Sequence, residues 1–391
     1  MKVKIIYRNY IPLNTPYYSF WSFPPKGVQF IIPKPIPYIK NLFFIYKYFR
    51  NNLIIKKLIK LFQNLFFDLN EKSTTNDIDL LFYISMIPEE PPQIPYIIDL
   101  EHIFMLFNGT NPSKEELNKI KRILLDKQCK RITPLSNAAK VSLKDYLGKD
   151  FYKKIEKKVE VVYPSLPNFK KILKEEKDYS IVNKNNNLKI LTVGNTPYSK
   201  GVVELLESFK ILRKKYNNIE LYCISNLSND LKQRYSDEKI HFFRSNIPHN
   251  EIIKKFFMRC DLFVLPTHGD TFCMVILEAL SCGLPVITTK QFAIEEMIKE
   301  GINGYYVKSD NLFLNKKHIL PVDYSKEILN YKIIENKLVN DLVSKMVILI
   351  ENKNLLNKLK LNTTEEFLPE GNFSIETRNK KLKRIFEEAL K

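Results

Sequence analysis

The segment Asp261–Thr288 constrains the fold of this chain more than any other. It begins with DLFVLP at Asp261–Pro266, a continuous apolar run of strand length bounded by a charge and a proline. A helical stretch containing LEAL follows, then a break at Cys282–Pro285 and a second apolar run at Val286–Thr288. The order strand, helix, strand predicts a βαβ unit with buried parallel strands.

Two carboxylates, Asp270 and Glu278, follow the first of these strands. Open parallel sheets bind ligands at the carboxyl ends of their strands, so we expect both side chains at a ligand site. For Asp270 the alternative is simple turn chemistry, since Gly-Asp pairs are common in loops. For Glu278 the alternative is a helix-surface glutamate. The apolar neighbours Leu277 and Ala279 argue against that alternative, because a buried carboxylate needs partners.

Strand and helix patterns alternate along both halves of the chain, which predicts an α/β fold of two Rossmann-like domains. The first half has strand patterns at Lys2–Tyr7, Val28–Ile32, Asp79–Ser85, Tyr96–Leu100, Arg131–Leu135 and Val159–Tyr163, and helix patterns at Ser113–Lys127 and Ala138–Leu147. The second half has strand patterns at Leu188–Val193, Ile219–Ile224 and Ile240–Phe243, and helix patterns at Gly201–Lys215, Asn250–Met258, Leu338–Leu361 and Ser374–Leu390. We expect an N-terminal domain at 1–170, a polar linker at 171–187, a C-terminal domain at 188–370 and a final helix at 371–391.

Composition places the chain in a reducing compartment. Five cysteines form no CxxC pair, and their odd count suits free thiols in a cytoplasmic protein. No zinc-ligand spacing is present. The first ten residues lack the apolar core of a signal peptide, and no run reaches the roughly 20 apolar residues that span a bilayer. We expect a cytoplasmic protein, either soluble or peripheral on the cytoplasmic membrane face.

The net charge of +19 admits two explanations. It favours an anionic partner such as a membrane surface, or it reflects a composition rich in Lys, Ile and Asn. The segment 35–67 is basic, without an acidic residue, and its apolar residues recur at helical spacing from Leu53 onward. This pattern is typical of a core-facing helix with a solvated face, and also of a helix on an anionic membrane. No RNA-binding signature is present, so a nucleic-acid partner is not expected.

The string TFCMVILEALSCGLPV resembles the carboxylate motif of retaining glycosyltransferases of the GT-B fold, the family 4 or glycosyl transferases group 1 type. Thr271, Phe272, the Leu-Glu-Ala helix and the Cys-Gly-Leu-Pro-Val turn match. Asp270 stands where that family usually has Glu, and Cys273 where a second Gly is common. The resemblance is specific from about Leu188 to Val307, and it implies that the last helix crosses back onto the N-terminal domain.

The resemblance also assigns roles at a nucleotide-sugar donor site. Lys200 would bind the donor diphosphate, with Gly201 allowing close backbone approach at a helix N-terminus. Glu278 would accept the ribose hydroxyls and Asp270 the sugar hydroxyls. Asn195 replaces an expected arginine, which removes one of two cations. The implied donor-binding set is Gly194, Asn195, Lys200, Gly201, Arg244, Ser245, Asp270, Thr271, Phe272, Cys273, Met274 and Glu278.

The implied catalytic residues are Asp270, Lys200 and His102. His102 follows the strand pattern at Tyr96–Leu100, where relatives place a histidine facing the donor sugar. The competing interpretation is a structural histidine, with Asp99 or Glu101 on the acceptor side.

The resemblance implies retaining transfer of a hexose from a UDP- or GDP-sugar to a glycan, glycolipid or lipid-linked acceptor, without a cofactor or a metal. One alternative is a catalytically impaired scaffold that binds a membrane surface or nucleic acid, motivated by the charge and by Asn195. A GT-B phosphorylase or a sugar epimerase is another, although no lysine is marked for pyridoxal phosphate.

Overall fold

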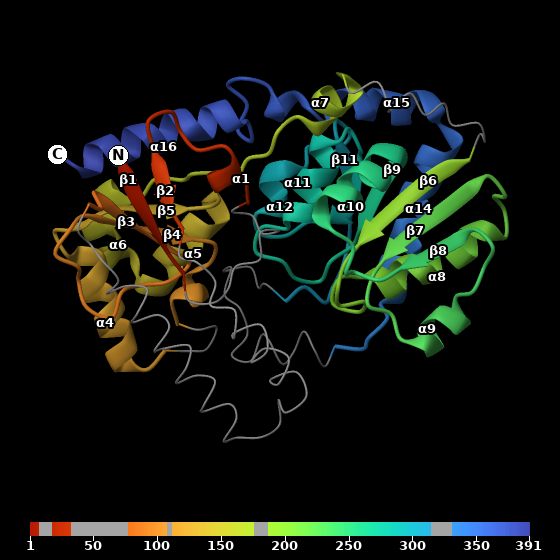
Figure 1. Cartoon of the computed structure of the whole chain (residues 1–391). Coiled ribbons are helices and arrows are strands. Elements are labelled where there is room, and N and C mark those ends of the chain that lie inside the picture. Colours follow the sequence, from red (N-terminus) through yellow and green to blue (C-terminus); the bar gives the residue numbers. More distant parts are fainter. Residues whose placement is uncertain (8–17, 33–76, 108–111, 176–186, 314–330) are drawn as a thin grey trace. The chain divides into compact units, whose positions relative to one another are not determined.

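The computed structural model describes residues 1–7, 18–32, 77–107, 112–175, 187–313 and 331–391 (Figure 1). The chain divides into two compact units. The first unit comprises residues 1–135, 147–162 and 379–391, and the second comprises 136–146 and 163–378. No single cut in the sequence therefore separates them. The basic segment 35–67, for which membrane docking was considered, lies outside the described residues.

The first unit is built on a parallel sheet with the strand order β2-β1-β3-β4-β5. Its strands are β1 (Lys2–Ile6), β2 (Gln29–Ile31), β3 (Leu80–Ile84), β4 (Tyr96–Leu100) and β5 (Cys129–Pro134). Its helices include α1 (Tyr18–Ser22), α4 (Lys114–Leu125), α6 (Lys149–Ile155) and most of α16 (Ile375–Ala389). The side chains of β3 and β4 are buried throughout, as expected for strands covered on both faces.

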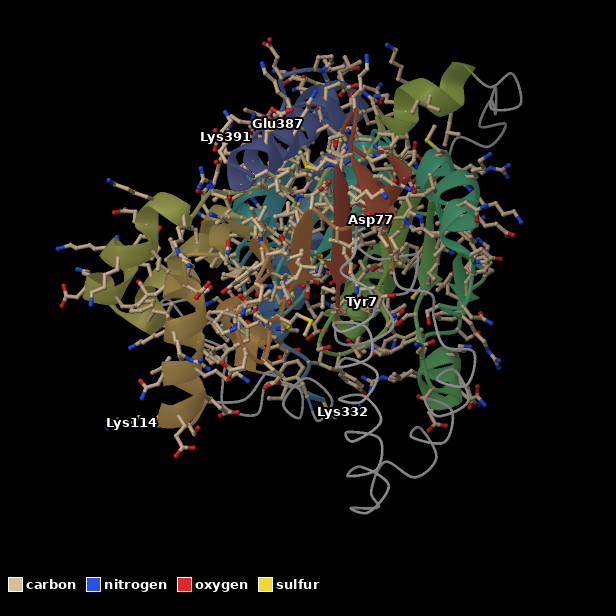
Figure 2. The ribbon with its side chains drawn as sticks, turned by 60° about the vertical axis from the view of Figure 1, so that its left-hand side comes forward. Tyr7, Asp77, Lys114, Lys332, Glu387 and Lys391 are labelled. Atoms are coloured by element: carbon tan, nitrogen blue, oxygen red, sulfur yellow. The ribbon has the colours of Figure 1, made fainter. Side chains whose placement is uncertain are left out.

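Helix α4 begins with a capping box formed by Ser113 and Glu116. Ser113 Oγ accepts a hydrogen bond from Glu116 N at 3.1 Å, and Glu116 Oε2 accepts one from Ser113 N at 2.8 Å. This reciprocal pair satisfies two amides that the start of α4 would otherwise leave unbonded. Figure 2 shows Lys114 directly at this helix start.

The prediction of a strand at Val159–Tyr163 is wrong. The segment forms only an isolated parallel bridge, between Ile132 and Val159. Glu160 N and Val162 N donate to the carbonyls of Ile132 and Pro134, so half of a ladder is present. The other half would require an N–H from Pro134, which proline lacks, and the ladder stops there.

Helix α16 carries the C-terminus into the first unit, with residues from 379 onward grouped there. Phe386 is fully buried, and its ring lies against Phe30 and Phe82 at centroid distances of 6.2 and 5.9 Å. Arg384 pairs with Glu160, and Glu388 pairs with Arg131. Glu387 lies on the exposed face of the helix, and the exposed Lys391 follows its end (Figure 2).

The second unit is built on a parallel sheet with the strand order β11-β10-β9-β6-β7-β8. Its strands are β6 (Leu188–Val193), β7 (Ile219–Ile224), β8 (Ile240–Phe243), β9 (Leu262–Leu265), β10 (Val286–Thr289) and β11 (Gly304–Val307). Its helices include α5 (Asn137–Leu147), α7 (Phe169–Glu175), α8 (Val202–Arg213), α9 (Asn229–Arg234), α10 (His249–Lys255), α11 (Met274–Ser281), α12 (Ile294–Met297), α14 (Asn336–Glu351) and α15 (Lys353–Asn362). The switch in strand order falls between β6 and β9, which is where such sheets bind ligands.

The βαβ unit predicted from Asp261 to Thr288 is confirmed as β9, α11 and β10. Strand β10 pairs with β9 in parallel, and all eight side chains of the two strands are buried. On one side of the sheet, α8 and α14 build a continuous apolar core with β6 and β7. The predicted helix Leu338–Leu361 is instead two helices, α14 and α15. Asn352 breaks it with non-helical backbone angles, and its side chain caps α15 by accepting from Leu355 N at 2.9 Å.

Helix α5 groups with the second unit through Glu296. The Glu296 carboxylate accepts from the backbone amides of Asn137 and Ala138, both at 2.8 Å, and from the Tyr163 hydroxyl at 2.6 Å. A carboxylate at a helix N-terminus satisfies unbonded amides and complements the helix dipole. Within the described part of the chain, none of the helices has both the length and the apolar character needed to cross a bilayer.

Candidate active site

The loops after β6 and β9 lie against each other at the carboxyl ends of these strands. The loop after β6 ends at Gly201, which has φ +66° and precedes α8. A Cβ added to Gly201 would lie 2.1 Å from the carbonyl oxygen of Pro266, in the loop after β9. Gly201 is therefore required both by its backbone conformation and by the close approach of the two loops.

This approach brings Lys200 and Asp270 together. Lys200 Nζ lies 2.6 Å from Asp270 Oδ2 and donates to the Gly269 carbonyl at 3.1 Å. The other carboxylate oxygen, Asp270 Oδ1, accepts from the backbone amides of Cys273 at 2.7 Å and Phe272 at 3.3 Å. Phe272 and Cys273 belong to the implied donor-binding set, and in the structure their amides hold the Asp270 carboxylate at the start of α11.

Asp270 is held in its ionised form. Burial acts to raise the pKa of its carboxyl, but the Lys200 ammonium and the Cys273 amide outweigh burial, so the pKa is below its usual value. The site therefore combines an anion and a cation whose charges are fixed by each other and by backbone dipoles.

Cys273 adopts a left-handed backbone conformation, φ 62°, immediately before α11. The related motif commonly has Gly here, which reaches this conformation without strain, whereas a side chain costs about 1–2 kcal/mol. The hydrogen bond from Cys273 N to Asp270 helps to hold this conformation. The Cys273 side chain is buried beside Asp270, and burial raises the pKa of its thiol well above the usual value.

Glu278 lies on α11 and contacts a residue that sequence analysis did not single out. His249 Nε2 is 2.7 Å from Glu278 Oε1, and the two side chains are only 21% and 14% exposed. Burial acts to lower the pKa of His249, but the Glu278 carboxylate outweighs it and raises that pKa above its usual value. The residues are 29 positions apart and no motif joins them, so only the fold reveals the pair.

The remaining predicted donor residues lie on neighbouring loops. Gly194 and Asn195 follow β6, and Asn195 is exposed. A Cβ on Gly194 would lie 2.9 Å from Lys200 Cβ, so this glycine also makes room for the lysine. Arg244 is exposed after β8, and Ser245 Oγ donates to Asn226 Oδ1 at 2.7 Å. Thr271 is buried, and Met274 begins α11.

His102 belongs to the first unit, whereas the other predicted site residues belong to the second. Its side chain is fully buried. Nδ1 accepts from Phe104 N at 3.2 Å, and the ring stacks on Phe104 at 5.3 Å. These contacts are those of a histidine that packs within the core, which is the competing interpretation of His102.

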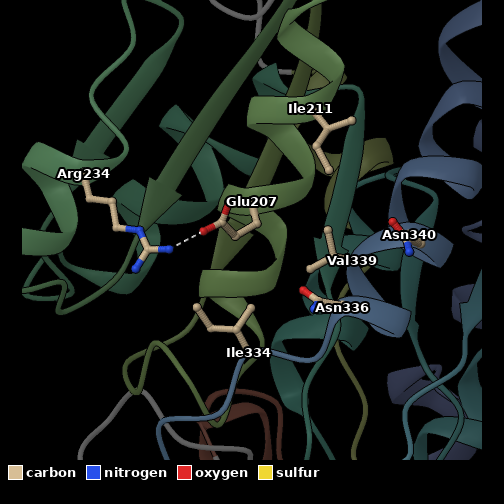
Figure 3. Close-up of a pocket in the computed structure, with 7 residues that line it drawn as sticks. All are labelled: Glu207, Ile211, Arg234, Ile334, Asn336, Val339 and Asn340. Atoms are coloured by element: carbon tan, nitrogen blue, oxygen red, sulfur yellow. Dashed lines mark hydrogen bonds and ion pairs between the residues drawn. The ribbon is translucent and has the colours of Figure 1, made fainter.

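One pocket of the second unit lies away from these loops. Figure 3 shows it between α8 and α14, with an ion pair between Arg234 and Glu207 at one end. It is lined by Glu207, Ile211, Arg234, Ile334, Asn336, Val339 and Asn340. None of the predicted site residues lines it, so it does not bear on the donor site.

Comparison with known proteins gives a family match over part of the chain. Residues 174–317 match the family model for glycosyl transferases group 1. The chain carries a glycosyl transferases group 1 domain. The matched segment contains Lys200, Asp270 and Glu278, so the resemblance found in the sequence is confirmed.

The curated relatives align over the same part of the chain. The capsular polysaccharide biosynthesis glycosyltransferase CapM of Staphylococcus aureus is 32% identical over 140 residues, covering 34% of this chain and 36% of CapM. A lipopolysaccharide 1,2-N-acetylglucosaminetransferase of Salmonella typhimurium is 28% identical over 130 residues, covering 30% and 34% of the two chains. The chain thus spans about a third of the length of the curated relatives it matches.

Solved structures resemble the fold of the whole chain. Anabaena Alr3699/HepE in complex with UDP gives a TM-score of 0.62 at 12% identity, covering 99% of this chain and 100% of that one. A glycosyltransferase from Rickettsia africae gives 0.59 at 14% identity, covering 100% and 98%. The two parallel sheets and these neighbours show the GT-B fold, with two Rossmann-like domains, as expected from the sequence.

Proposed function

We propose that this protein is a retaining glycosyltransferase that moves a sugar, expected to be a hexose, from a UDP- or GDP-sugar to a hydroxyl group of its acceptor. The acceptor would be a glycan, a glycolipid or a lipid-linked saccharide, and neither a cofactor nor a metal would be needed. CapM acts in capsular polysaccharide biosynthesis, and the HepE structures hold UDP and UDP-glucose; both support a nucleotide-sugar donor.

The contact between Lys200 and Asp270 carries this proposal. In a sugar nucleotide the diphosphate and the sugar are covalent neighbours, so the residues that bind them must be neighbours as well. Lys200, the expected diphosphate ligand, and Asp270, the expected sugar ligand, lie 2.6 Å apart. The bond that breaks would then lie beside this pair. Glu278, further along α11, would hold the ribose.

The proposed reaction keeps the anomeric configuration. The bond between the anomeric carbon and the diphosphate oxygen breaks, and both electrons go to the leaving diphosphate. The acceptor oxygen attacks from the same face, and its proton passes to the leaving phosphate oxygen. Lys200 and the amides at the start of α8 would stabilise the charge that develops on the diphosphate. Asp270, ionised by its surroundings, would orient the sugar hydroxyls.

A thermal-shift panel tests the donor site. UDP, GDP, ADP and their common sugar conjugates would be added to the wild type and to Lys200→Ala and Glu278→Ala. A ligand that binds only the folded state raises its apparent stability. We expect one nucleotide to stabilise the wild type, and its affinity to fall at least about tenfold in each variant because a charged hydrogen bond is lost. Lys210→Ala and Glu295→Ala, both exposed positions of the same unit, are the matched controls.

The same panel separates the proposal from its alternative. If no nucleotide shifts the wild type, the donor-site assignment fails, and the exposed Asn195 in place of arginine becomes the favoured reason. A binding protein on a transferase scaffold would then be the better hypothesis. Equal loss of affinity in the control variants would also contradict the proposed site.

A further inference from the structure

A buried histidine–glutamate pair lies next to the proposed donor site, with the histidine two residues before Asp270. His268 immediately precedes Gly269 and Asp270, and its side chain and that of Glu204 on α8 are both 0% exposed. His268 Nε2 lies 3.0 Å from Glu204 Oε1. On the other side of the ring, Nδ1 lies 3.2 Å from the Asn311 carbonyl and 3.3 Å from Ser309 Oγ. Neither His268 nor Glu204 belongs to the motif that identified the family.

The partners of His268 fix where its protons lie. The Asn311 carbonyl can only accept, and the Ser309 hydroxyl already donates to Glu335 Oε2 at 2.7 Å. The Tyr331 hydroxyl is farther from Nδ1, at 3.5 Å, so the shorter contacts favour a hydrogen on Nδ1. Nε2 and Glu204 Oε1 then share one further proton. Wherever it resides between them, the pair as a whole is neutral, which is the state that complete burial requires.

The backbone around His268 joins the two loops of the site. His268 N donates to the Ser199 carbonyl at 2.9 Å, and Ser199 directly precedes Lys200. The His268 carbonyl accepts from Phe313 N at 2.7 Å. The ring is thus clamped between α8 and the segment at 309–313, while its backbone holds the Lys200 loop.

We propose that His268 is a positioning residue that, together with Glu204, fixes the loop from Thr267 to Asp270 so that Asp270 and Lys200 keep their mutual geometry. A buried ion pair is weak evidence for stability, because apolar residues of similar volume often replace it without loss. Replacing both partners with apolar residues is therefore expected to leave global stability near that of the wild type. The effect of His268 on sugar transfer rests on the proposed function. Its effect on the order of the loop from Thr267 to Asp270 does not.

The test uses a double variant, Glu204→Leu with His268→Phe. Replacing both partners leaves neither of them unpaired, whereas either single change would leave a buried polar group without its partner and could unfold the protein. Hydrogen exchange of the amides in 266–275 reads loop order without any ligand. We expect exchange there to become at least about tenfold faster at an unchanged melting temperature, since local opening is separable from global unfolding. His241→Phe, on β8 and 3.9 Å from Glu220, is the control histidine and should leave exchange in 266–275 unchanged.

Kinetics supply the second measurement. In the double variant we expect kcat to fall at least about tenfold while KM for the sugar nucleotide changes less than about threefold, because misplacement acts mainly on the transition state. The single variant Glu204→Gln, which keeps His268, should retain most of the wild-type kcat. The glutamine amide can donate to Nε2 of a neutral imidazole while Nδ1–H still binds the Asn311 carbonyl.

The outcomes are distinct. Wild-type exchange over 266–275 in the double variant overturns the positioning role, whatever the kinetics. Faster exchange with unchanged kcat confines the pair to structure and also overturns it. If the wild type binds no nucleotide, the proposed function fails, yet the exchange measurement still decides whether His268 orders the loop.

Discussion

The ionised Asp270 side chain belongs to the proposed donor site and also stabilises the fold, so both roles depend on its protonation state. Its carboxylate pairs with Lys200 and bonds the amides before α11, and its pKa lies below the usual value. A depressed pKa in the folded state means that ionised Asp270 stabilises the fold at pH values above its unfolded pKa, 3.8. That stabilisation is lost as the pH falls through the lower, folded-state pKa.

We predict that Asp270→Asn lowers the free energy of unfolding by about 1–3 kcal/mol at neutral pH, the range for hydrogen bonds to charged groups. Asparagine keeps an acceptor for Cys273 but loses the charge that holds Lys200. Urea unfolding from pH 7 down to pH 3 should show the difference between variant and wild type narrowing below about pH 4. A difference that does not change with pH would show that the charge is not the cause.

His249 has the opposite pH dependence. Its pKa is raised above 6.5 because Glu278 favours the imidazolium. The stabilisation is therefore complete below about pH 6.5 and disappears as the pH rises through the folded-state pKa. We predict that His249→Asn costs about 1–2 kcal/mol of unfolding free energy at pH 6 and clearly less at pH 9. His241→Asn, at a more exposed contact with Glu220, is the control variant. A larger cost at pH 9 would refute the pairing.

Local motifs in the sequence predicted some residues of the candidate site but not the residue pairs that form across the fold. Lys200, Asp270 and Glu278 could be predicted as site residues because each lies in a recognisable motif after a strand, and the structure places Lys200 beside Asp270. His249 and His268 were missed because their partners, Glu278 and Glu204, are 29 and 64 positions away. Such pairs arise from helices and loops that meet only after the sheet forms, and a lone histidine carries no local signal of its partner.

At the scale of elements, the meeting of two loops depends on Gly201. Gly201 and Gly301 both have positive φ, 66° and 73°, but only Gly201 has backbone atoms where a Cβ would be. We predict that Gly301→Ala costs about 1 kcal/mol, the price of the left-handed conformation alone. Gly201→Ala should cost at least about 2 kcal/mol more, because the Pro266 carbonyl must move.

Chemical denaturation of both glycine variants, with hydrogen exchange over 266–275, checks this prediction. Faster exchange in that segment should accompany Gly201→Ala only. Equal free-energy losses in the two variants would mean that the loops adjust freely.

Strand prediction failed at one element for a reason that its own residues do not show. The segment Val159–Tyr163 has the apolar pattern of a strand, but the missing N–H of Pro134 on the neighbouring strand ends its pairing.

At the scale of the whole molecule, the two units provide separate probes of unfolding. The backbone amides of β3 and β4 report on the first unit, and those of β6 and β9 report on the second. The first unit is completed by α16, whose Phe386 contacts Phe30 and Phe82. The sequence predicted a helix here, while its contacts required knowledge of which β-strands it meets.

We predict that Phe386→Ala destabilises the first unit by about 3–5 kcal/mol, as expected for a fully buried aromatic side chain. Phe209→Ala, equally buried on α8, should instead destabilise the second unit. Unfolding would be followed by hydrogen exchange of the amides in β3 and β4 and of those in β6 and β9 at increasing urea concentration. Phe386→Ala should shift the transition of β3 and β4, and Phe209→Ala should shift that of β6 and β9 while β3 and β4 stay near the wild type. Equal shifts of both signals in both variants would show that the chain unfolds as one cooperative body despite its division into two units.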